Sequence, residues 1–346
     1  MNGHKTKIVA TIGATSGNGS REKLYEMIKA GMDAARINFS HAKYSEVEEQ
    51  VKWIREISAE LRQKVYLLAD LAGPKIRLGE LKDGQFRIKK GDELGLAFGV
   101  AHSGGPILPV KFDFSQYVSP RQRVFIFDGK IEAEVVAVVG KVVKIVAKTD
   151  GYVTSRNGIN LPDTSFVGDA LTGKDLKDLE FIKTQDFDWV GLSFVHGAED
   201  ISMLRKIIRT YPRPPKIVAK IETKAAIEPR NLTEIIKASD GAMVARGDMA
   251  YEIGAELVPI IQWRIVKSCH EHKKFSIIAT QMLESMVESA SPTRAEVSDV
   301  ARAVFEGANY VMLSEETALG KYPVETVKEM DRITKTIIKN AKLGMK

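Results

Sequence analysis

The stretch Lys216-Ile-Val-Ala-Lys-Ile-Glu-Thr223, followed by Asp240-Gly-Ala-Met-Val-Ala-Arg-Gly-Asp248, decides the fold. Each half is a short apolar, β-branched run that ends in charged residues, which is typical of a strand buried on both faces in a parallel sheet. Because side chains alternate along a strand, Lys220 and Glu222 are expected to point the same way. Asp248 is expected just past the second strand, behind a glycine that lets the backbone approach a ligand.

This arrangement would bring one ammonium and two carboxylates to the rim of a parallel sheet. Two carboxylates beside an open position suit Mg²⁺ or Mn²⁺, and a lysine beside them suits a phosphoryl oxygen. A simpler interpretation is a Lys220–Glu222 salt bridge with Asp248 as a helix cap, and these two segments alone do not decide between the two.

Strands and helices alternate outward from this stretch. Further strands are expected at 7–13, 35–40, 65–70, 188–194, 276–280 and 310–314. Helices are expected at 20–30, where Ser20 is a plausible N-cap, and at 44–61, 169–185, 199–211, 257–272, 293–307 and 322–342. About eight strands close a parallel barrel, and such barrels carry their chemistry at the carboxyl ends of the strands.

The alternation breaks between about Leu78 and Asn157, where no helical period is found. Short alternating strands are expected there instead, at 85–89, 123–127 and 130–135. The sequence therefore predicts an α/β fold, a (β/α)8 TIM barrel with a small all-β lid domain inserted after the third barrel strand. The expected domains are 1–77 and 158–346 for the barrel and 78–157 for the lid.

Composition limits the class of protein. The 346 residues are 44% hydrophobic, enough for one large domain or two, and the one cysteine, Cys269, fits a reducing compartment. No apolar run approaches the length of a membrane span, and no signal peptide is evident, so a cytoplasmic protein without a membrane partner is expected. The net charge of +6 comes from basic residues interleaved with acidic ones, which favours an anionic small molecule over nucleic acid.

Ten segments, in order along nearly the whole chain, resemble pyruvate kinase. They are Thr11–Gly13, Ala35–His41, Gly73–Arg77, Asn157–Pro162, Ala170–Asp175, Lys220–Glu222, Met243–Asp248, Ala279–Met286, Pro292–Asp299 and Met312–Thr317. The resemblance implies the same barrel and inserted lid. It also leads us to expect that the family's usual C-terminal domain is absent, since the chain stops at the last barrel helix.

The resemblance implies a glycolytic transfer of the phosphoryl group of phosphoenolpyruvate to ADP, giving pyruvate and ATP. Its implied roles are divalent metal ligation by Glu222 and Asp248; catalysis by Lys220, Thr280 and Arg36; substrate binding by Arg36, Ser193, Lys220, Gly247, Asp248 and Thr280; nucleotide binding by Arg36, His41, Arg77 and Asn157; and a proton relay through Glu284 and Ser314. A purely structural interpretation of these residues stays open. In it, Arg36 pairs with Asp70, Thr280 forms a hydrogen bond with the backbone at a strand end, and Glu284 caps a helix.

The resemblance also bears on potassium. Many members hold a monovalent cation at residues matching Asn38, Ser40, Asp70 and Leu71, beside a glutamate, and here that glutamate position is Lys75. An ammonium can supply the charge of the ion, so we expect no potassium requirement. The helices at 257–272 and 293–307 are the expected faces of a homodimer.

Two rival functions remain open at this stage. A metal-dependent carbon–carbon lyase acting on pyruvate-type substrates also uses a Glu/Asp-bound metal, but it needs neither Lys220 nor a lid. The second rival is a catalytically weak pyruvate-kinase paralogue with a binding or regulatory role. It is suggested by the expected absence of the C-terminal domain and by lid substitutions such as Asn157, where the family usually has a lysine.

Overall fold

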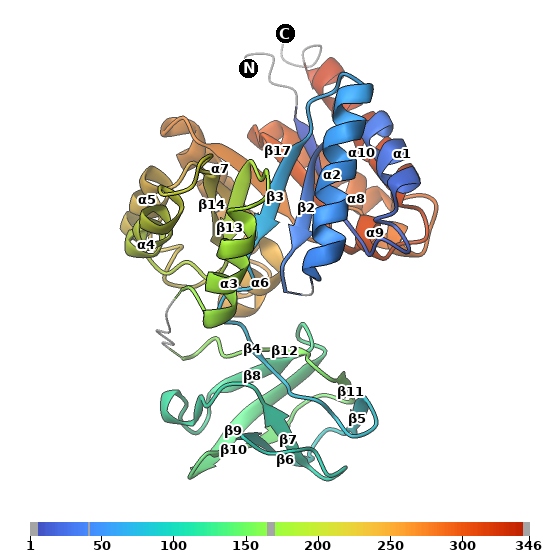
Figure 1. Ribbon diagram of the computed structural model, residues 1–346. Helices are drawn as coiled ribbons and strands as arrows, with labels where there is room; N and C mark the ends of the chain where they lie inside the picture. Colours follow the sequence, from blue (N-terminus) through green and yellow to red (C-terminus); the bar gives the residue numbers. More distant parts are fainter. Residues whose placement is uncertain (1–5, 41, 165–169, 342–346) are drawn as a thin grey trace. The chain divides into compact units, whose positions relative to one another are not determined.

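The computed structural model describes residues 6–40, 42–164 and 170–341 (Figure 1). The chain divides into two compact units. The first comprises Met1–Gly73, Ala170–Arg246 and Pro259–Lys346, and the second comprises Pro74–Asp169 and Gly247–Val258. Among the described residues, none of the helices combines the length and apolar character needed to cross a membrane.

The first unit is built on a closed barrel of eight parallel strands, in the order β1-β17-β16-β15-β14-β13-β3-β2. The strands are β1 Lys7–Thr11, β2 Met32–Asn38, β3 Tyr66–Asp70, β13 Trp189–Leu192, β14 Lys216–Ile221, β15 Gly241–Ala245, β16 Phe275–Ala279 and β17 Tyr310–Leu313. Most positions in these strands are buried, as the continuous apolar runs predict. The predicted barrel is confirmed.

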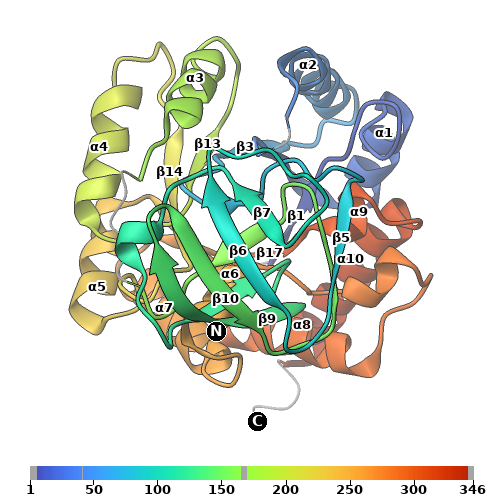
Figure 2. The same ribbon diagram turned by 90° about the horizontal axis from the view of Figure 1, so that it is seen from below.

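Helices surround these strands in an outer ring (Figure 2). They are α1 Arg21–Ala30, α2 Tyr44–Glu60, α3 Gly173–Ile182, α4 Ala198–Ile208, α5 Pro229–Ala238, α7 Val258–Glu271, α8 Arg294–Glu306, α9 Glu315–Ala318 and α10 Pro323–Ala341, with a short 3-10 turn, η2, at Glu284–Val287. Three of these helices begin directly after a capping residue. The Ser20 side chain accepts a hydrogen bond from Lys23 N at the start of α1, and Thr172 and Thr293 form capping boxes at the starts of α3 and α8. The expected start of α3 at Asp169 lies outside the described residues.

The amino-terminal end of the barrel is filled by aromatic side chains. Tyr66, Trp189, Phe275 and Tyr310 are each the first residue of a strand. The ring centroid of Trp189 lies 4.8 Å from that of Tyr66, 4.9 Å from Phe275 and 5.2 Å from Tyr310. Large rings at this end leave the opposite, carboxyl end of the barrel for polar side chains.

The second unit is mainly β. Its strands are β4 Ile76–Arg77, β5 Gln85–Ile88, β6 Glu93–Phe98, β7 Ile107–Val110, β8 Arg123–Ile126, β9 Ile131–Val139, β10 Val142–Ala147, β11 Gly151–Thr154 and β12 Gly158–Asn160, with a 3-10 turn, η1, at Ser115–Tyr117. One sheet runs β4-β12-β8-β9-β10-β6-β7, and the Leu78–Val110 bridge brings its two ends together into a barrel-like form. β5 and β11 pair separately. The inserted all-β domain after β3 is therefore confirmed.

A helix that the sequence did not predict, α6 (Arg246–Ile253), joins this second unit from Gly247 onward. The Tyr251 hydroxyl donates to the carbonyl of Asp128, and its ring centroid lies 5.6 Å from that of Phe125. Asp248 thus lies in the first turn of a helix rather than simply beyond a strand end. The boundaries expected at 77 and 157 stay predictions.

Candidate active site

Polar side chains from neighbouring strands converge at the carboxyl end of the barrel. Arg36 comes from β2 and Asp70 ends β3; Ser193 follows β13, Lys220 lies in β14 and Glu222 follows that strand. Parallel strands bring their carboxyl ends to the same edge, so residues far apart in sequence meet here.

Arg36 and Asp70 form a buried pair. Arg36 Nε donates to Asp70 Oδ2 over 2.7 Å, and Arg36 Nη1 donates to the Thr11 hydroxyl over 3.1 Å. Burial by itself raises the pKa of Asp70, but the charges of Lys220 and Arg36 outweigh it and hold that pKa below its usual value. The expected ion pair between Arg36 and Asp70 is therefore present. It also orients the Arg36 guanidinium.

Lys220 is held by three groups. Its Nζ donates to Ser193 Oγ over 2.6 Å and lies 3.3 Å from Asp70 Oδ1 and 3.7 Å from Glu222 Oε2. The Lys220 side chain is 13% exposed, and that of Glu222 is 1% exposed. Lys220 and Glu222 thus point the same way, as strand alternation predicts, and the ammonium is fixed in place.

The backbone around this cluster adopts uncommon conformations. Phe194 has φ +53°, and its N–H donates to Glu222 Oε1 over 2.7 Å. Gly73 has φ +66°, and a Cβ there would come within 2.8 Å of Ser193 Cβ. Thr280 has φ +70°, which is rare for a β-branched residue. Such backbone strain clusters at functional sites.

Thr280 directly follows β16, and its hydroxyl donates to the carbonyl of Ala279 over 2.6 Å. Arg246 supports this strand end: its Nε donates to the same carbonyl over 3.1 Å, and its Nη2 donates to the carbonyl of Thr280. Asp299 holds Arg246 through both carboxylate oxygens, at 2.7 and 2.9 Å. Sequence reasoning gave Arg246 and Asp299 no role, although both lie in segments that carry the resemblance.

The second unit contains the other predicted carboxylate, Asp248. Lys75 Nζ donates to Asp248 Oδ1 over 2.6 Å, and Asn160 Nδ2 donates to the same oxygen over 3.0 Å. Burial lowers the pKa of Arg77, against the opposing charges of Asp248 and Asp128. Glu222 and Asp248 thus belong to different units of the chain.

The remaining predicted residues have local contacts. Asn38 Oδ1 accepts from Ser40 N over 3.1 Å, and the Leu71 carbonyl accepts from Ser193 Oγ over 2.7 Å. Asn157 Oδ1 accepts from Thr154 N over 2.6 Å.

The proton-relay candidates and His41 complete the predicted set. Glu284 is the first residue of η2 and is exposed, and Ser314 N donates to Glu316 Oε2 over 2.6 Å. Gly247 lies in α6. His41, predicted to bind nucleotide, lies outside the described residues.

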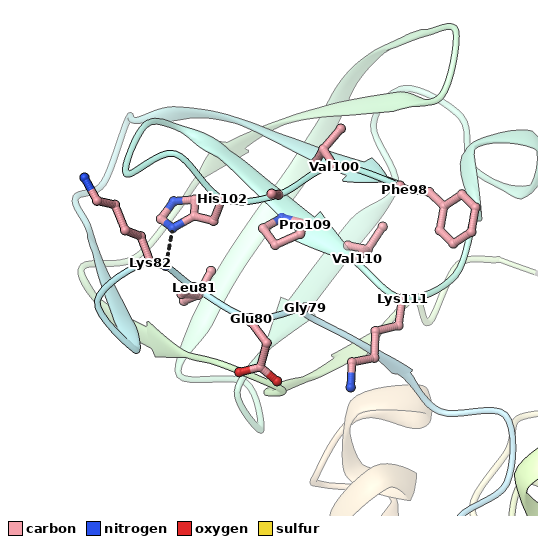
Figure 3. A pocket seen from close by; sticks show the side chains of 12 residues that line it. Gly79, Glu80, Leu81, Lys82, Phe98, Val100, His102, Pro109, Val110 and Lys111 are labelled. Atoms are coloured by element: carbon pink, nitrogen blue, oxygen red, sulfur yellow. Dashed lines mark hydrogen bonds between the residues drawn. The ribbon is translucent and has the colours of Figure 1, made fainter.

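A cavity of about 470 Å³ opens within the inserted β domain (Figure 3). His102 lies on its wall, with Nδ1 accepting from Lys82 N over 3.0 Å, and Phe98 and Lys111 lie across it. None of the predicted site residues lines this cavity.

The comparisons with known proteins agree with this geometry. A family model described as the pyruvate kinase barrel domain matches residues 3–327. A pyruvate kinase of Thermococcus litoralis is 40% identical over 334 residues, covering 96% of this chain and 70% of the relative. That of Thermotoga maritima is 38% identical over 331 residues, covering 95% and 70%. Pyruvate kinase 2 of a Synechocystis species is 40% identical over 338 residues, covering 96% and 56%. With its barrel, its inserted β domain and the lysine–carboxylate cluster at the strand ends, the chain belongs to the pyruvate kinase family.

Proposed function

We propose that this protein transfers the phosphoryl group of phosphoenolpyruvate to ADP, giving pyruvate and ATP. The observation that carries the proposal is the Lys220 ammonium, fixed by Ser193, Asp70 and Glu222 at the carboxyl end of the barrel. Phosphoryl transfer depends mainly on positioning and on fixed charges that face the transferring group, so a cation held before the substrate arrives suits it.

Three residues of the barrel unit are assigned to the phosphoryl group. Lys220 offsets negative charge on the oxygens during transfer. Arg36, held by Asp70, presents its guanidinium to the phosphate, and the Ser193 hydroxyl supplies a further polar contact. Because these side chains are already fixed, little reorganisation is needed when the substrate binds.

Glu222 and Asp248 are assigned to a divalent cation, Mg²⁺ or Mn²⁺. Their carboxylate oxygens are the ligands that such hard cations prefer, and Glu222 lies beside Lys220 at the carboxyl end of the barrel. Asn160 Oδ1, beside Asp248, is buried without a hydrogen-bond partner in the part of the chain that the structure describes. When bound, the cation supplies positive charge for the substrate carboxylate and phosphoryl oxygens.

Further residues are assigned by family position. Gly247, Asp248 and Thr280 bind the substrate carboxylate, and Thr280 marks the face on which the enolate takes its proton. Glu284 and Ser314 form the proton path, while Arg36, Arg77, Asn157 and His41 serve the nucleotide. The partly exposed, strained Thr280 supports the first assignment, since strain of this kind is found where a side chain must face a ligand.

We also propose that the protein works without potassium, with Lys75 in place of the ion at the site of Asn38, Ser40, Asp70 and Leu71. The supporting observation is chemical: Lys75 carries a positive charge at the position where many members of the family have a glutamate beside the cation site.

A homodimer is proposed through α7 and α8. Ile260 and Trp263 on α7 and Phe305 on α8 are exposed, and Trp263 and Phe305 line a shallow cavity of about 540 Å³. Exposed apolar patches of this kind mark interfaces. A cytoplasmic location is also proposed, because the one cysteine of the chain, Cys269, is a free thiol, which fits a reducing compartment.

The decisive experiment measures pyruvate formed from phosphoenolpyruvate with ADP and Mg²⁺. Rapid, metal-dependent formation of equal amounts of pyruvate and ATP is expected. Pyruvate formed without ATP would instead point to carbon–carbon lyase chemistry, and binding of phosphoenolpyruvate without turnover would point to a regulatory paralogue.

A further inference from the structure

Lys75 and Asp248 form a close ion pair within the second unit. Their atoms Nζ and Oδ1 are 2.6 Å apart, and the two side chains are only 14% and 20% exposed. A charge-assisted hydrogen bond of this length is roughly twice as strong as a neutral one. Lys75 therefore neutralises the same carboxylate that the proposed function assigns to the divalent cation.

The fold fixes both partners of this pair. Ile76, directly after Lys75, pairs with Ile159 in the antiparallel ladder between β4 and β12, and Asn160 at the end of β12 donates to the same Asp248 oxygen over 3.0 Å. Tyr251 in α6 ties the helix that carries Asp248 to the carbonyl of Asp128. The contact is thus set by the packing of one unit.

Gly158 leaves the space that the Lys75 side chain fills. A Cβ added at Gly158 would overlap Lys75 Cε and lie 3.1 Å from Nζ. The backbone φ of Gly158 lies outside the left-handed region, so the conformation does not require glycine. What matters at this position is the absence of a side chain, which leaves space for Lys75. A side chain at position 158 would therefore displace the Lys75 stem from its present path to Asp248.

Two cations cannot share one carboxylate oxygen at hydrogen-bonding distance without strong repulsion. From this geometry, and resting on the proposed metal role of Asp248, we infer that Lys75 is a positioning residue that competes with the divalent cation for Asp248. In the metal-free protein the ion pair orders Asp248, and metal binding has to release the ammonium. Lys75 thereby lowers the affinity for the metal and stabilises the metal-free form.

The test measures Mn²⁺ binding by titration calorimetry, in the absence of substrates, for the unmodified protein and for Lys75→Met. Removing the competitor is expected to tighten the dissociation constant about tenfold, which corresponds to ~1.4 kcal/mol. The melting temperature without metal should fall, while the rise on adding Mn²⁺ should grow. A role of Lys75 in folding alone would lower both melting temperatures equally.

Two further variants sharpen the test. Lys148→Met removes an exposed lysine of the same unit that pairs with Glu134, so it matches the charge change and should leave Mn²⁺ affinity within about twofold. Gly158→Ala crowds the stem of Lys75 without removing its charge and should also tighten Mn²⁺ binding. This second variant keeps the inference testable if Lys75→Met does not fold.

The outcomes separate the inference from the proposed function. If Asp248→Asn abolishes Mn²⁺ binding but Lys75→Met and Gly158→Ala bind Mn²⁺ as Lys148→Met does, the competition is wrong and the metal site stands. If the unmodified protein does not bind Mn²⁺, or Asp248→Asn binds it normally, the metal site is wrong and the competition is overturned with it.

Discussion

Arg36 Nε and Nη2 both lie 2.7 Å from Asp70 Oδ2, so one buried carboxylate orients the guanidinium proposed to face the phosphoryl group. The other oxygen of Asp70 lies 3.3 Å from Lys220 Nζ. Asp70 is therefore the common anchor of two cations, although no step of the proposed transfer assigns it a reacting atom.

Replacing Asp70 by asparagine is expected to lower the free energy of unfolding by ~3–5 kcal/mol, because two largely buried cations, each 13% exposed, lose their shared buried anion. Urea unfolding of Asp70→Asn checks this value. The matched control is Glu234→Gln, which breaks an exposed pair with Lys237 and should cost less than ~1 kcal/mol. Equal losses in the two variants would contradict the anchoring role.

Lys220→Met should lower turnover steeply while Mn²⁺ binding is retained. A fixed cation that faces the transferring group is commonly worth ~3–4 kcal/mol, or about 10²–10³ in rate. Steady-state kinetics with Mn²⁺ titration measure both quantities, with the exposed Lys206→Met as control. Turnover like that of the control would remove Lys220 from the mechanism.

Thr280→Val should slow protonation of the enolate far more than phosphoryl transfer, since the change removes a hydroxyl but keeps the shape. The two half-reactions are separated by following hydrogen exchange at the pyruvate methyl group and, independently, formation of ATP. A similar loss in both would argue that Thr280 acts only on substrate binding.

Glu296→Gln tests a pH-dependent link between η2 and α8. Ser285 N and Oγ donate to Glu296 over 2.6 Å each, and Thr293 N donates over 2.7 Å. Burial raises the pKa of Glu296, but these hydrogen bonds outweigh it and leave the pKa lowered. The folded-state pKa is thus below the unfolded value of ~4.3, so the stabilisation is complete above that pH and is lost as the pH falls through the folded-state pKa.

We expect Glu296→Gln to lower the free energy of unfolding by ~1–3 kcal/mol at pH 7, because strong donors then meet a neutral amide. The difference from the unmodified protein should shrink as urea unfolding is repeated at lower pH, below about 4. A difference that is constant with pH would mean that the Glu296 charge has no part in it.

Potassium should have little effect on the rate. Rates in potassium and in tetramethylammonium, at matched ionic strength, are expected to be nearly equal. Lys75→Glu should acquire a potassium requirement, because the change removes the ammonium that supplies the charge of the ion. Strong activation of the unmodified protein by potassium would refute the assignment.

The barrel and the inserted β domain were predictable because their strands carry local signals, continuous apolar runs in one and short alternation with turn residues in the other. Helix α6 was missed because Arg246–Ile253 has a glycine at its second position and little apolar period. Periodicity also gives no information on which distant side chains meet. The contact between Asn160 and Asp248, 88 positions apart, depends on the packing of α6 against β strands within the second unit.

The pairing of β1 with β17 has a consequence for biosynthesis. Thr11 and Leu313, whose hydrogen bond helps to join these strands, are 302 positions apart. During synthesis on the ribosome, β1 therefore cannot pair with β17 until almost all of the barrel sequence has been made. One edge of β1 stays unpaired until then. Such late closure is slow and exposes the nascent chain to aggregation, so chaperone demand should fall on the barrel strands more than on the locally paired hairpins of the inserted domain.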